Sequence, residues 1–234
     1  MWFPVAGEIF GSTKNMIWMM NEKNEMALFK PDPTGVEHSA ESTIYQIATF
    51  FEIPYSRVIP YTLNNITGYL SIVEDTYQYH RINAYDFYHQ SNEDFEYSIK
   101  GFPKECFQSL CKVAFLDTLC KNGSRHFAGI DFLMNDSITV APLYDSEISL
   151  SDIYGEYTEL HIDHSKKWTH QEVFHYLKSL DFMQDIIAKI NTEEFKELCH
   201  SITYGDFIYQ RAVKLLQSER KCPSDSLSKE YPSL

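Results

Sequence analysis

Residues 115–145, FLDTLCKNGSRHFAGIDFLMNDSITVAPLYD, decide the fold of this chain of 234 residues. The apolar residues at its start have helical spacing, and Asn122 with Gly123 is a turn signal that ends the predicted helix. Two β-prone runs, 130–134 and 138–141, follow with a short polar connection between them, which predicts a hairpin. Pro142 breaks the second strand, and a carboxylate follows it at Asp145. The stretch therefore predicts a helix, a polar loop, a hairpin and an acidic residue, in that order.

Kinase folds build a phosphoryl-transfer site in this order: the loop supplies the proton acceptor and one metal ligand, and the later Asp holds Mg²⁺. In this chain the loop reads Asn122-Gly123-Ser124-Arg125-His126-Phe127-Ala128-Gly129, and the hairpin is followed by Pro142-Leu143-Tyr144-Asp145. These residues resemble the HipA-like Ser/Thr protein kinases, which share this loop with the phosphatidylinositol kinases. The family pattern is N-x-D-R-H-x-x-N, a hairpin, and then P-L-Y-D. The resemblance therefore implies a kinase fold with Asp145 as the metal ligand.

Two positions of the loop depart from the family pattern. Ser124 stands where the family has its catalytic Asp, and Gly129 stands where it has a metal-binding Asn. A neutral hydroxyl is a poor proton acceptor beside a carboxylate, and glycine offers a metal only its backbone carbonyl. Arg125 and His126 match the family, and we expect them to brace the loop by hydrogen bonds to the backbone or to Asp145. The resemblance thus supports the fold more strongly than the reaction.

Composition narrows the class of protein. A hydrophobic content of 44% with 15% aromatic residues indicates a globular chain with a real core. The formal net charge of −13 argues against direct contact with nucleic acid or an anionic membrane. The five cysteines have no C-x-x-C spacing, so buried thiols are expected and a zinc site is not. With no signal peptide and no apolar run near ~20 residues, the sequence predicts a cytoplasmic, soluble protein.

The N-terminal part of the chain predicts a phosphate-binding side. Gly11 and Ser12 begin a Gly-Ser-Thr-Lys turn that could cover phosphates, although it lacks the Walker spacing. Strands are expected at 15–20 and 26–30, with Lys30 at the end of the second. A lysine there would ordinarily extend its ammonium to solvent. The resemblance, through the Phe-Lys pair at this place, implies instead that Lys30 binds the nucleotide phosphates.

A helix is predicted over 37–51, and it carries the acidic partner of that lysine. In kinases a strand Lys pairs with a helix Glu to position phosphates. Glu41 matches the family's acidic position best, and Glu37 is the alternative. Strands at 57–63 and 68–73 follow, and Val73 with Glu74 is expected at the hinge, where backbone groups would contact adenine.

The rest of the chain predicts a larger helical lobe. We expect short helices and loops over 76–103, and a surface segment over 148–167 in the place of an activation segment. Asp117 is interpreted as a structural carboxylate, and Asp131 could reach a metal in place of the missing Asn. Five helices are predicted, over 104–121, 171–180, 181–190, 193–200 and 204–220. The expected fold is α+β and two-lobed: a β-rich lobe with one helix (1–75), a helical lobe (76–221) and a tail (222–234).

Three functions fit these residues. The first is a pseudokinase that binds ATP, with Mg²⁺ if Asp145 holds it, and regulates a protein partner. The second is an active, atypical Ser/Thr kinase or nucleotidyl transferase, because loose phosphoryl transfer depends mainly on positioning and charge neutralisation. The third is a scaffold with an empty cleft, which has no need for Lys30 or Asp145. The resemblance further implies a protein Ser/Thr substrate and a bacterial setting.

Overall fold

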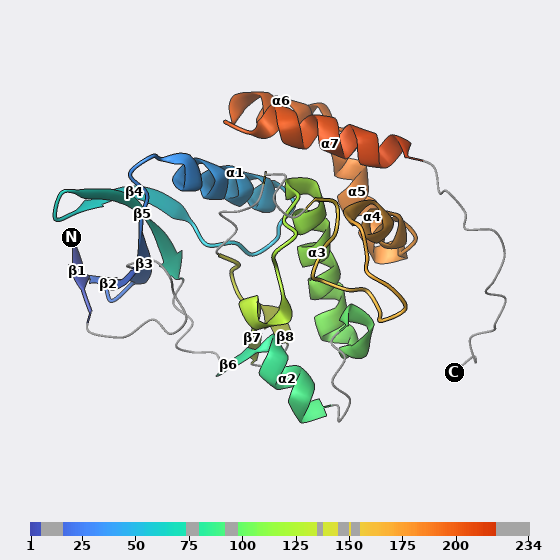
Figure 1. Ribbon diagram of the computed structural model, residues 1–234, viewed down its shortest axis with the longest axis horizontal. Coiled ribbons are helices and arrows are strands. Elements are labelled where there is room, and N and C mark those ends of the chain that lie inside the picture. Colours follow the sequence, from blue (N-terminus) through green and yellow to red (C-terminus); the bar gives the residue numbers. More distant parts are fainter. Residues whose placement is uncertain are drawn as a thin grey trace, which may run out of the picture.

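The computed structural model describes residues 1–5, 16–73, 80–91, 98–134, 138–144, 150 and 155–218. It shows two lobes, a sheet lobe at the N-terminal side with one helix and a larger helical lobe (Figure 1). The predicted fold class is confirmed: the structure is α+β, with a curled sheet in one lobe and helices in the other. The predicted boundary after residue 75 and the predicted tail from residue 222 lie outside the described residues.

The sheet lobe is built on five antiparallel strands in the order β1-β2-β3-β5-β4. Their bounds are β1 (Trp2–Pro4), β2 (Ile17–Asn21), β3 (Met26–Pro31), β4 (Val58–Leu63) and β5 (Ile66–Val73). Four of them lie where the sequence predicts strands. The fifth, β1, was not predicted, because three residues ending in proline carry no periodic signal, and the strand exists through its pairing with β2.

Helix α1 (Val36–Phe50) begins immediately after a tight turn at the end of β3. The Asp32 side chain accepts hydrogen bonds from the backbone N–H of Gly35 (2.9 Å) and of His38 (2.8 Å). Burial raises the pKa of Asp32, but the hydrogen bonds from His38, Thr34 and Gly35 lower it by more, so the net shift is downward. Gly35 has φ 73°, a conformation that favours glycine. This turn fixes the start of α1 relative to the strand that carries Lys30.

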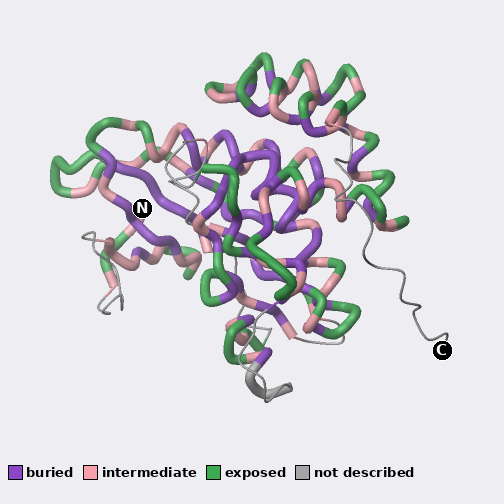
Figure 2. The backbone as a smooth tube through the Cα atoms, turned by 45° about the vertical axis from the view of Figure 1, so that its right-hand side comes forward, coloured by how far each residue is buried: buried purple, intermediate pink, exposed green. Residues whose placement is uncertain are grey.

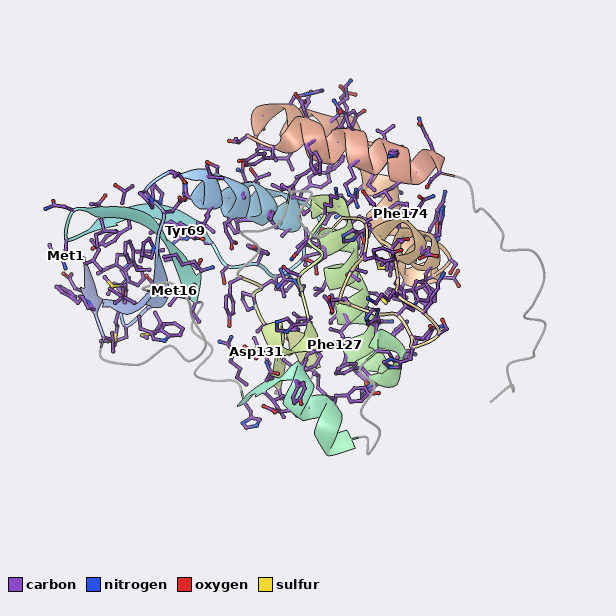
Figure 3. The ribbon with its side chains drawn as sticks, in the orientation of Figure 1. Met1, Met16, Tyr69, Phe127, Asp131 and Phe174 are labelled. Carbon is purple, nitrogen blue, oxygen red and sulfur yellow. The ribbon has the colours of Figure 1, made fainter. Side chains whose placement is uncertain are left out.

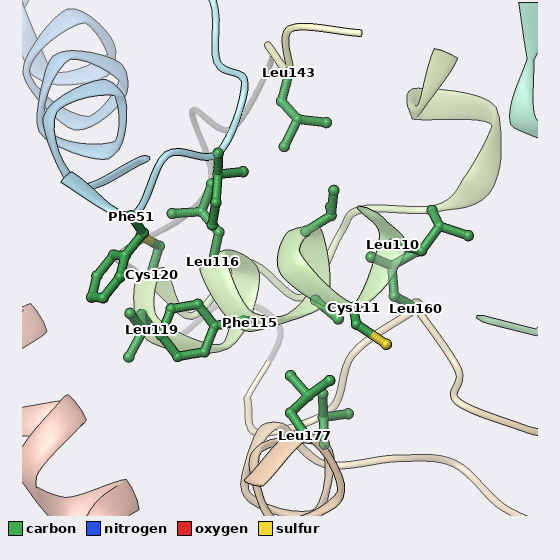
Figure 4. Packing of buried hydrophobic residues seen from close by; sticks show 14 of the residues in the cluster. Phe51, Leu110, Cys111, Phe115, Leu116, Leu119, Cys120, Leu143, Leu160 and Leu177 are labelled. Carbon is green, nitrogen blue, oxygen red and sulfur yellow. The ribbon is translucent and has the colours of Figure 1, made fainter. Parts of the chain in front are cut away.

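Helix α3 (Lys104–Cys120) is the centre of the helical lobe. From Val113 to Cys120 each of its residues is buried, and the rest of the lobe packs around it (Figure 4). Helices α4 and α7 contact it directly, as does β8. The other helices are α2 (Ala84–Ser91), α4 (His170–Lys178), α5 (Gln184–Ala188), α6 (Glu193–Ser201) and α7 (Gly205–Gln217), with short 3-10 turns η1 (Ile99–Gly101), η2 (Phe127–Gly129), η3 (Asp181–Met183) and η4 (Lys189–Asn191).

A second, small sheet lies beside the predicted polar loop. It has the order β6-β7-β8, with bounds β6 (His80–Asn83), β7 (Asp131–Met134) and β8 (Ile138–Val140). The hairpin β7–β8 was predicted, but β6 was not, and the expectation of only helices and loops over 76–103 is wrong at these four residues. The sequence His-Arg-Ile-Asn has a single apolar residue, so β6 is stabilised by antiparallel pairing with β7 rather than by a local pattern.

Most described residues of the segment expected at the surface, 148–167, are exposed, but the expectation is wrong for three of them. Thr158, Leu160 and Ile162 are buried, and Figure 2 shows how burial is distributed along the chain. The backbone N–H of Ile99 donates to His161 O (2.9 Å), and that of Lys100 donates to Ile162 O (3.1 Å). Among the described residues of this segment, the buried apolar side chains are those of Leu160 and Ile162, and two such positions give no recognisable period.

The described cysteines are buried free thiols, as predicted; Cys222 lies outside the described residues. Burial raises the pKa of Cys106 to about 11 and of Cys111 to about 12, so these thiols are protonated at neutral pH. Over the described residues, no helix has both the length and the apolar character needed to cross a membrane.

Candidate functional site

Lys30 and Glu41 form a buried ion pair between the sheet and helix α1. Lys30 Nζ lies 3.6 Å from Glu41 Oε1, and both side chains are 0% exposed. Lys30 is in β3, where it is paired with Tyr69 of β5, and its Nζ also lies 5.8 Å from the centre of the Tyr69 ring. Figure 3 labels Tyr69 beside α1. Of the two acidic candidates, Glu41 is therefore the one that pairs with Lys30.

The second oxygen of Glu41 is held by a residue that sequence reasoning missed. The hydroxyl of Tyr55 donates to Glu41 Oε2 at 2.5 Å, and both residues are buried. Tyr55 follows α1 by five residues and lies just before β4. An aromatic residue after an Ile-Pro turn gives no sequence signal for such a contact, because Tyr residues are frequent throughout this chain.

The polar loop starts where α3 ends, at Lys121 with φ 54°. Asn122 donates from Nδ2 to Asp117 Oδ1 at 3.0 Å, and its Oδ1 accepts from the Ser124 hydroxyl at 2.9 Å. The Asp117 carboxylate can only accept, so it fixes the amide of Asn122 with the oxygen toward Ser124. The Ser124 hydroxyl therefore donates its proton to a hydrogen bond within the loop.

Arg125 ties the loop to α3 and to the segment after the hairpin. Its Nε donates to both oxygens of Asp117 (3.1 and 2.9 Å), and its Nη1 donates to the backbone oxygen of Tyr144 (3.3 Å). Burial lowers the pKa of the Arg125 guanidinium, but the Asp117 carboxylate raises it by more, so the net shift is upward and Arg125 stays charged. Arg125 thus braces the loop through the backbone, as expected, and through Asp117, which has the structural role that the sequence suggested.

The last residues of the loop face solvent. His126, Ala128 and Gly129 are exposed, and Gly129 closes the 3-10 turn η2. A Cβ atom at Gly129 would meet only His126 Cε1, at 4.0 Å. The space around Gly129 therefore admits a Cβ atom, and no steric clash requires glycine at this position.

Asp131, the suggested substitute metal ligand, is engaged in a different interaction. Its carboxylate accepts from Arg81 of β6, through Nε at 2.8 Å and through Nη2, and from Asn83 Nδ2 at 2.9 Å. Asn83 also donates to Ala128 O at 2.9 Å, so β6 supports the end of the loop. Figure 3 shows Asp131 close to the strands β6 and β7. The structure thus places Asp131 in an ion pair, and Arg81 and Asn83 are two further site residues that the sequence did not reveal.

Four candidate residues, Gly11, Ser12, Glu74 and Asp145, lie outside the described residues. Val73 is the last residue of β5 and is half-buried. The segment leading to Asp145 is described as far as Tyr144, and its Leu143 is bonded to Pro54 and Ser56 of the sheet lobe. In the part of the chain that the structure describes, no group of three or more His, Cys, Asp or Glu side chains is arranged to hold a metal.

No protein-family model matches this chain, and no curated protein matches it. Solved structures of other proteins, however, are similar to this chain. The proinflammatory kinase CtkA of Helicobacter pylori is similar with a TM-score of 0.55 at 16% identity, over 89% of each chain. HipA of Shewanella oneidensis, solved with HipB and operator DNA, is similar with a TM-score of 0.50 at 12% identity, over 82% of this chain and 57% of HipA. At these identities the likeness concerns the fold: this chain has a kinase-like fold, of the kind seen in CtkA and HipA.

Proposed function

We propose that this chain binds ATP between its two lobes and acts mainly as a pseudokinase that regulates a protein partner. In this proposal Glu41 holds Lys30, and the Lys30 ammonium group contacts the phosphates. Gly11 and Ser12 cover the phosphates, Val73 and Glu74 face the adenine, and Asp145 holds Mg²⁺. The observation that carries the proposal is the buried Lys30–Glu41 pair.

Stability does not account for that pair. Taking two charges out of water costs several kcal/mol for each ion, and apolar replacements of a buried ion pair are often neutral or stabilising. A strand Lys paired with a helix Glu is, in contrast, the arrangement by which kinases position nucleotide phosphates. The Lys30 ammonium group, paired with Glu41, therefore fits the phosphates of a nucleoside triphosphate. Because Lys30 is 0% exposed, nucleotide entry requires local opening around its ammonium group.

The loop explains why transfer should be weak. Ser124 is neutral, and its proton is directed to Asn122, so it offers no carboxylate to accept a proton from a substrate hydroxyl. Gly129 has no side-chain ligand for a metal, and the nearby Asp131 is paired with Arg81. Any Mg²⁺ would depend on Asp145. Ser124 and Gly129 thus lack the functional groups that the family pattern has at these positions. The loop itself is still braced by Arg125 and Asp117.

The alternative is an active, atypical Ser/Thr kinase or nucleotidyl transferase. The bracing of the loop by Arg125 and Asp117 supports it, because phosphoryl transfer depends mainly on positioning and charge neutralisation. Restoring the family pattern with Ser124→Asp plus Gly129→Asn separates the two. A gain of transfer activity supports the pseudokinase, and wild-type activity that the restoration does not change supports the alternative.

Calorimetry of ATP binding, with and without Mg²⁺ or Mn²⁺, tests the proposal. Lys30→Ala should weaken binding strongly, whereas Lys189→Ala, which removes an exposed pair with Glu52, should not. Since Lys30→Ala leaves Glu41 buried without this partner, the double variant Lys30→Met/Glu41→Gln, checked for folding by circular dichroism, is measured as well. Failure of the wild-type chain to bind ATP under all conditions would overturn the proposal and leave the scaffold.

The partner is proposed to be a protein. HipA, one of the similar structures, was solved with HipB and operator DNA. The net charge of −13 in the present chain gives no support for direct DNA contact, so nucleic acid is not proposed as its ligand.

A further inference from the structure

We propose that Tyr55 is a positioning residue that holds Glu41 toward Lys30 and fixes helix α1 to the segment that leads to Asp145. The link to nucleotide affinity rests on the proposed function. The positioning of Glu41 itself rests on contacts that are independent of any ligand.

The two oxygens of the Glu41 carboxylate have different partners. Oε1 lies 3.6 Å from Lys30 Nζ, which is longer than the ≈ 2.7–2.9 Å of a charge-assisted hydrogen bond. Oε2 accepts from the Tyr55 hydroxyl at 2.5 Å. Of these two contacts the shorter one is the more directional, so Tyr55 orients the carboxylate through Oε2. Both Glu41 and Tyr55 are buried, and water does not compete for this bond.

The backbone around Tyr55 is paired with the segment that follows the hairpin. Leu143 N–H donates to Pro54 O at 3.1 Å, and Ser56 N–H donates to Leu143 O at 2.7 Å, which makes a short parallel bridge between Tyr55 and Leu143. The next residue along, Tyr144, accepts a hydrogen bond from Arg125 through its backbone oxygen. Two residues beyond Leu143 lies Asp145.

Tyr55 therefore joins three parts of the site. Its hydroxyl holds Glu41 on α1, and the backbone groups of its neighbours Pro54 and Ser56 bond to Leu143. The next residue, Tyr144, is bonded to Arg125 of the loop, which pairs with Asp117 on α3. A movement of α1 that carried Glu41 away from Lys30 would have to break the hydrogen bond to Tyr55. We infer that the paired arrangement of Lys30 and Glu41 is built into the fold and does not wait for an activating event.

Tyr55→Phe tests this inference, because it keeps the buried ring and removes only the hydroxyl. Hydrogen exchange at the amides of Ser56 and Leu143 is the first readout, and we expect it to accelerate about tenfold, the effect of losing a hydrogen bond to a charged group. Exchange at Ile99 and Lys100, whose amides bond to the 161–162 segment, should not change. The matched control is Tyr61→Phe, which removes a tyrosine hydroxyl bonded to Trp2 O elsewhere in the same lobe.

The second readout is the affinity for Mg²⁺-ATP, expected to fall about tenfold in Tyr55→Phe and to stay unchanged in Tyr61→Phe. Unchanged exchange at Ser56 and Leu143, or equal acceleration at Ile99 and Lys100, would overturn the positioning role. Should the wild-type chain fail to bind ATP while the exchange changes as expected, the proposed function fails and the positioning of Glu41 by Tyr55 stands.

Discussion

Replacing Asp117 by asparagine removes the counter-charge of Arg125 and keeps the size of the side chain. The two side chains are 3% and 2% exposed and share two hydrogen bonds, at 2.9 and 3.1 Å. Breaking a buried ion pair by removing one partner costs roughly 3–5 kcal/mol, because the charge that stays buried loses its ion-pair partner. The asparagine oxygen still accepts one bond from Arg125, so we expect a loss near the lower limit, about 3 kcal/mol.

Thermal and urea unfolding measure this loss. For a chain of this size about 3 kcal/mol lowers Tm by roughly 6–12 °C. The matched control is Glu193→Gln, which removes the exposed partner of Lys196 and should cost less than about 1 kcal/mol. The double variant Asp117→Asn/Arg125→Gln replaces the pair by two neutral groups and should be more stable than Asp117→Asn alone. If Asp117→Asn costs no more than Glu193→Gln, the loop is not held by this pair, and the reasoning is wrong.

Three further predictions concern other parts of the molecule. Burial, and then Arg211, lower the pKa of the buried His170 to about 4, so the unfolded chain binds the proton first and the fold should lose about 2 kcal/mol of stability between pH 7 and pH 5. His170→Leu should remove this contribution and make the slope in urea titrations clearly shallower. Thr169→Ala removes the capping box of α4 with Glu172 and should cost about 1–2 kcal/mol in the same assay. Gly68→Ala should cost about 1–3 kcal/mol, since its Cβ would lie 2.2 Å from Lys30 O, whereas Gly129→Ala should be nearly neutral in thermal unfolding.

Each of these has a result that would contradict it. An unchanged slope between pH 7 and pH 5 in His170→Leu would place the acid sensitivity on another group. Asp163 is not that group, because its lowered pKa of about 2 confines its effect to below about pH 4. A Thr169→Ala variant as stable as the wild type would mean that α4 is held by packing alone. Equal stability of the two glycine variants would mean that β3 moves away from Gly68 at little cost.

Local sequence determined the elements that carry the site. The turn signal after the apolar helix, the β-prone runs of the hairpin and the helical stripe over 37–51 each lie within one short window, so periodicity and turn chemistry suffice to place them. Lys30 and Glu41 could be named because the Phe-Lys pair and the acidic helix position resemble those of the HipA-like family. The substitutions at Ser124 and Gly129 are likewise readable from the sequence alone.

The tertiary structure decided what those elements touch. Strand β6, the buried segment around Leu160, the Arg81–Asp131 pair and the Tyr55–Glu41 bond join residues that are distant in the sequence. None of them leaves a period or a turn signal, because each is stabilised by a partner from another part of the chain. Asp131 shows the difference. The sequence left the direction of its carboxylate open. The pairing of β6 with β7 places Arg81 and Asn83 beside this carboxylate, so that Asp131 forms a structural ion pair with Arg81. The sequence alone thus determined which groups are present at the site, and only the packing of the two lobes determined which of them are held in place and by what.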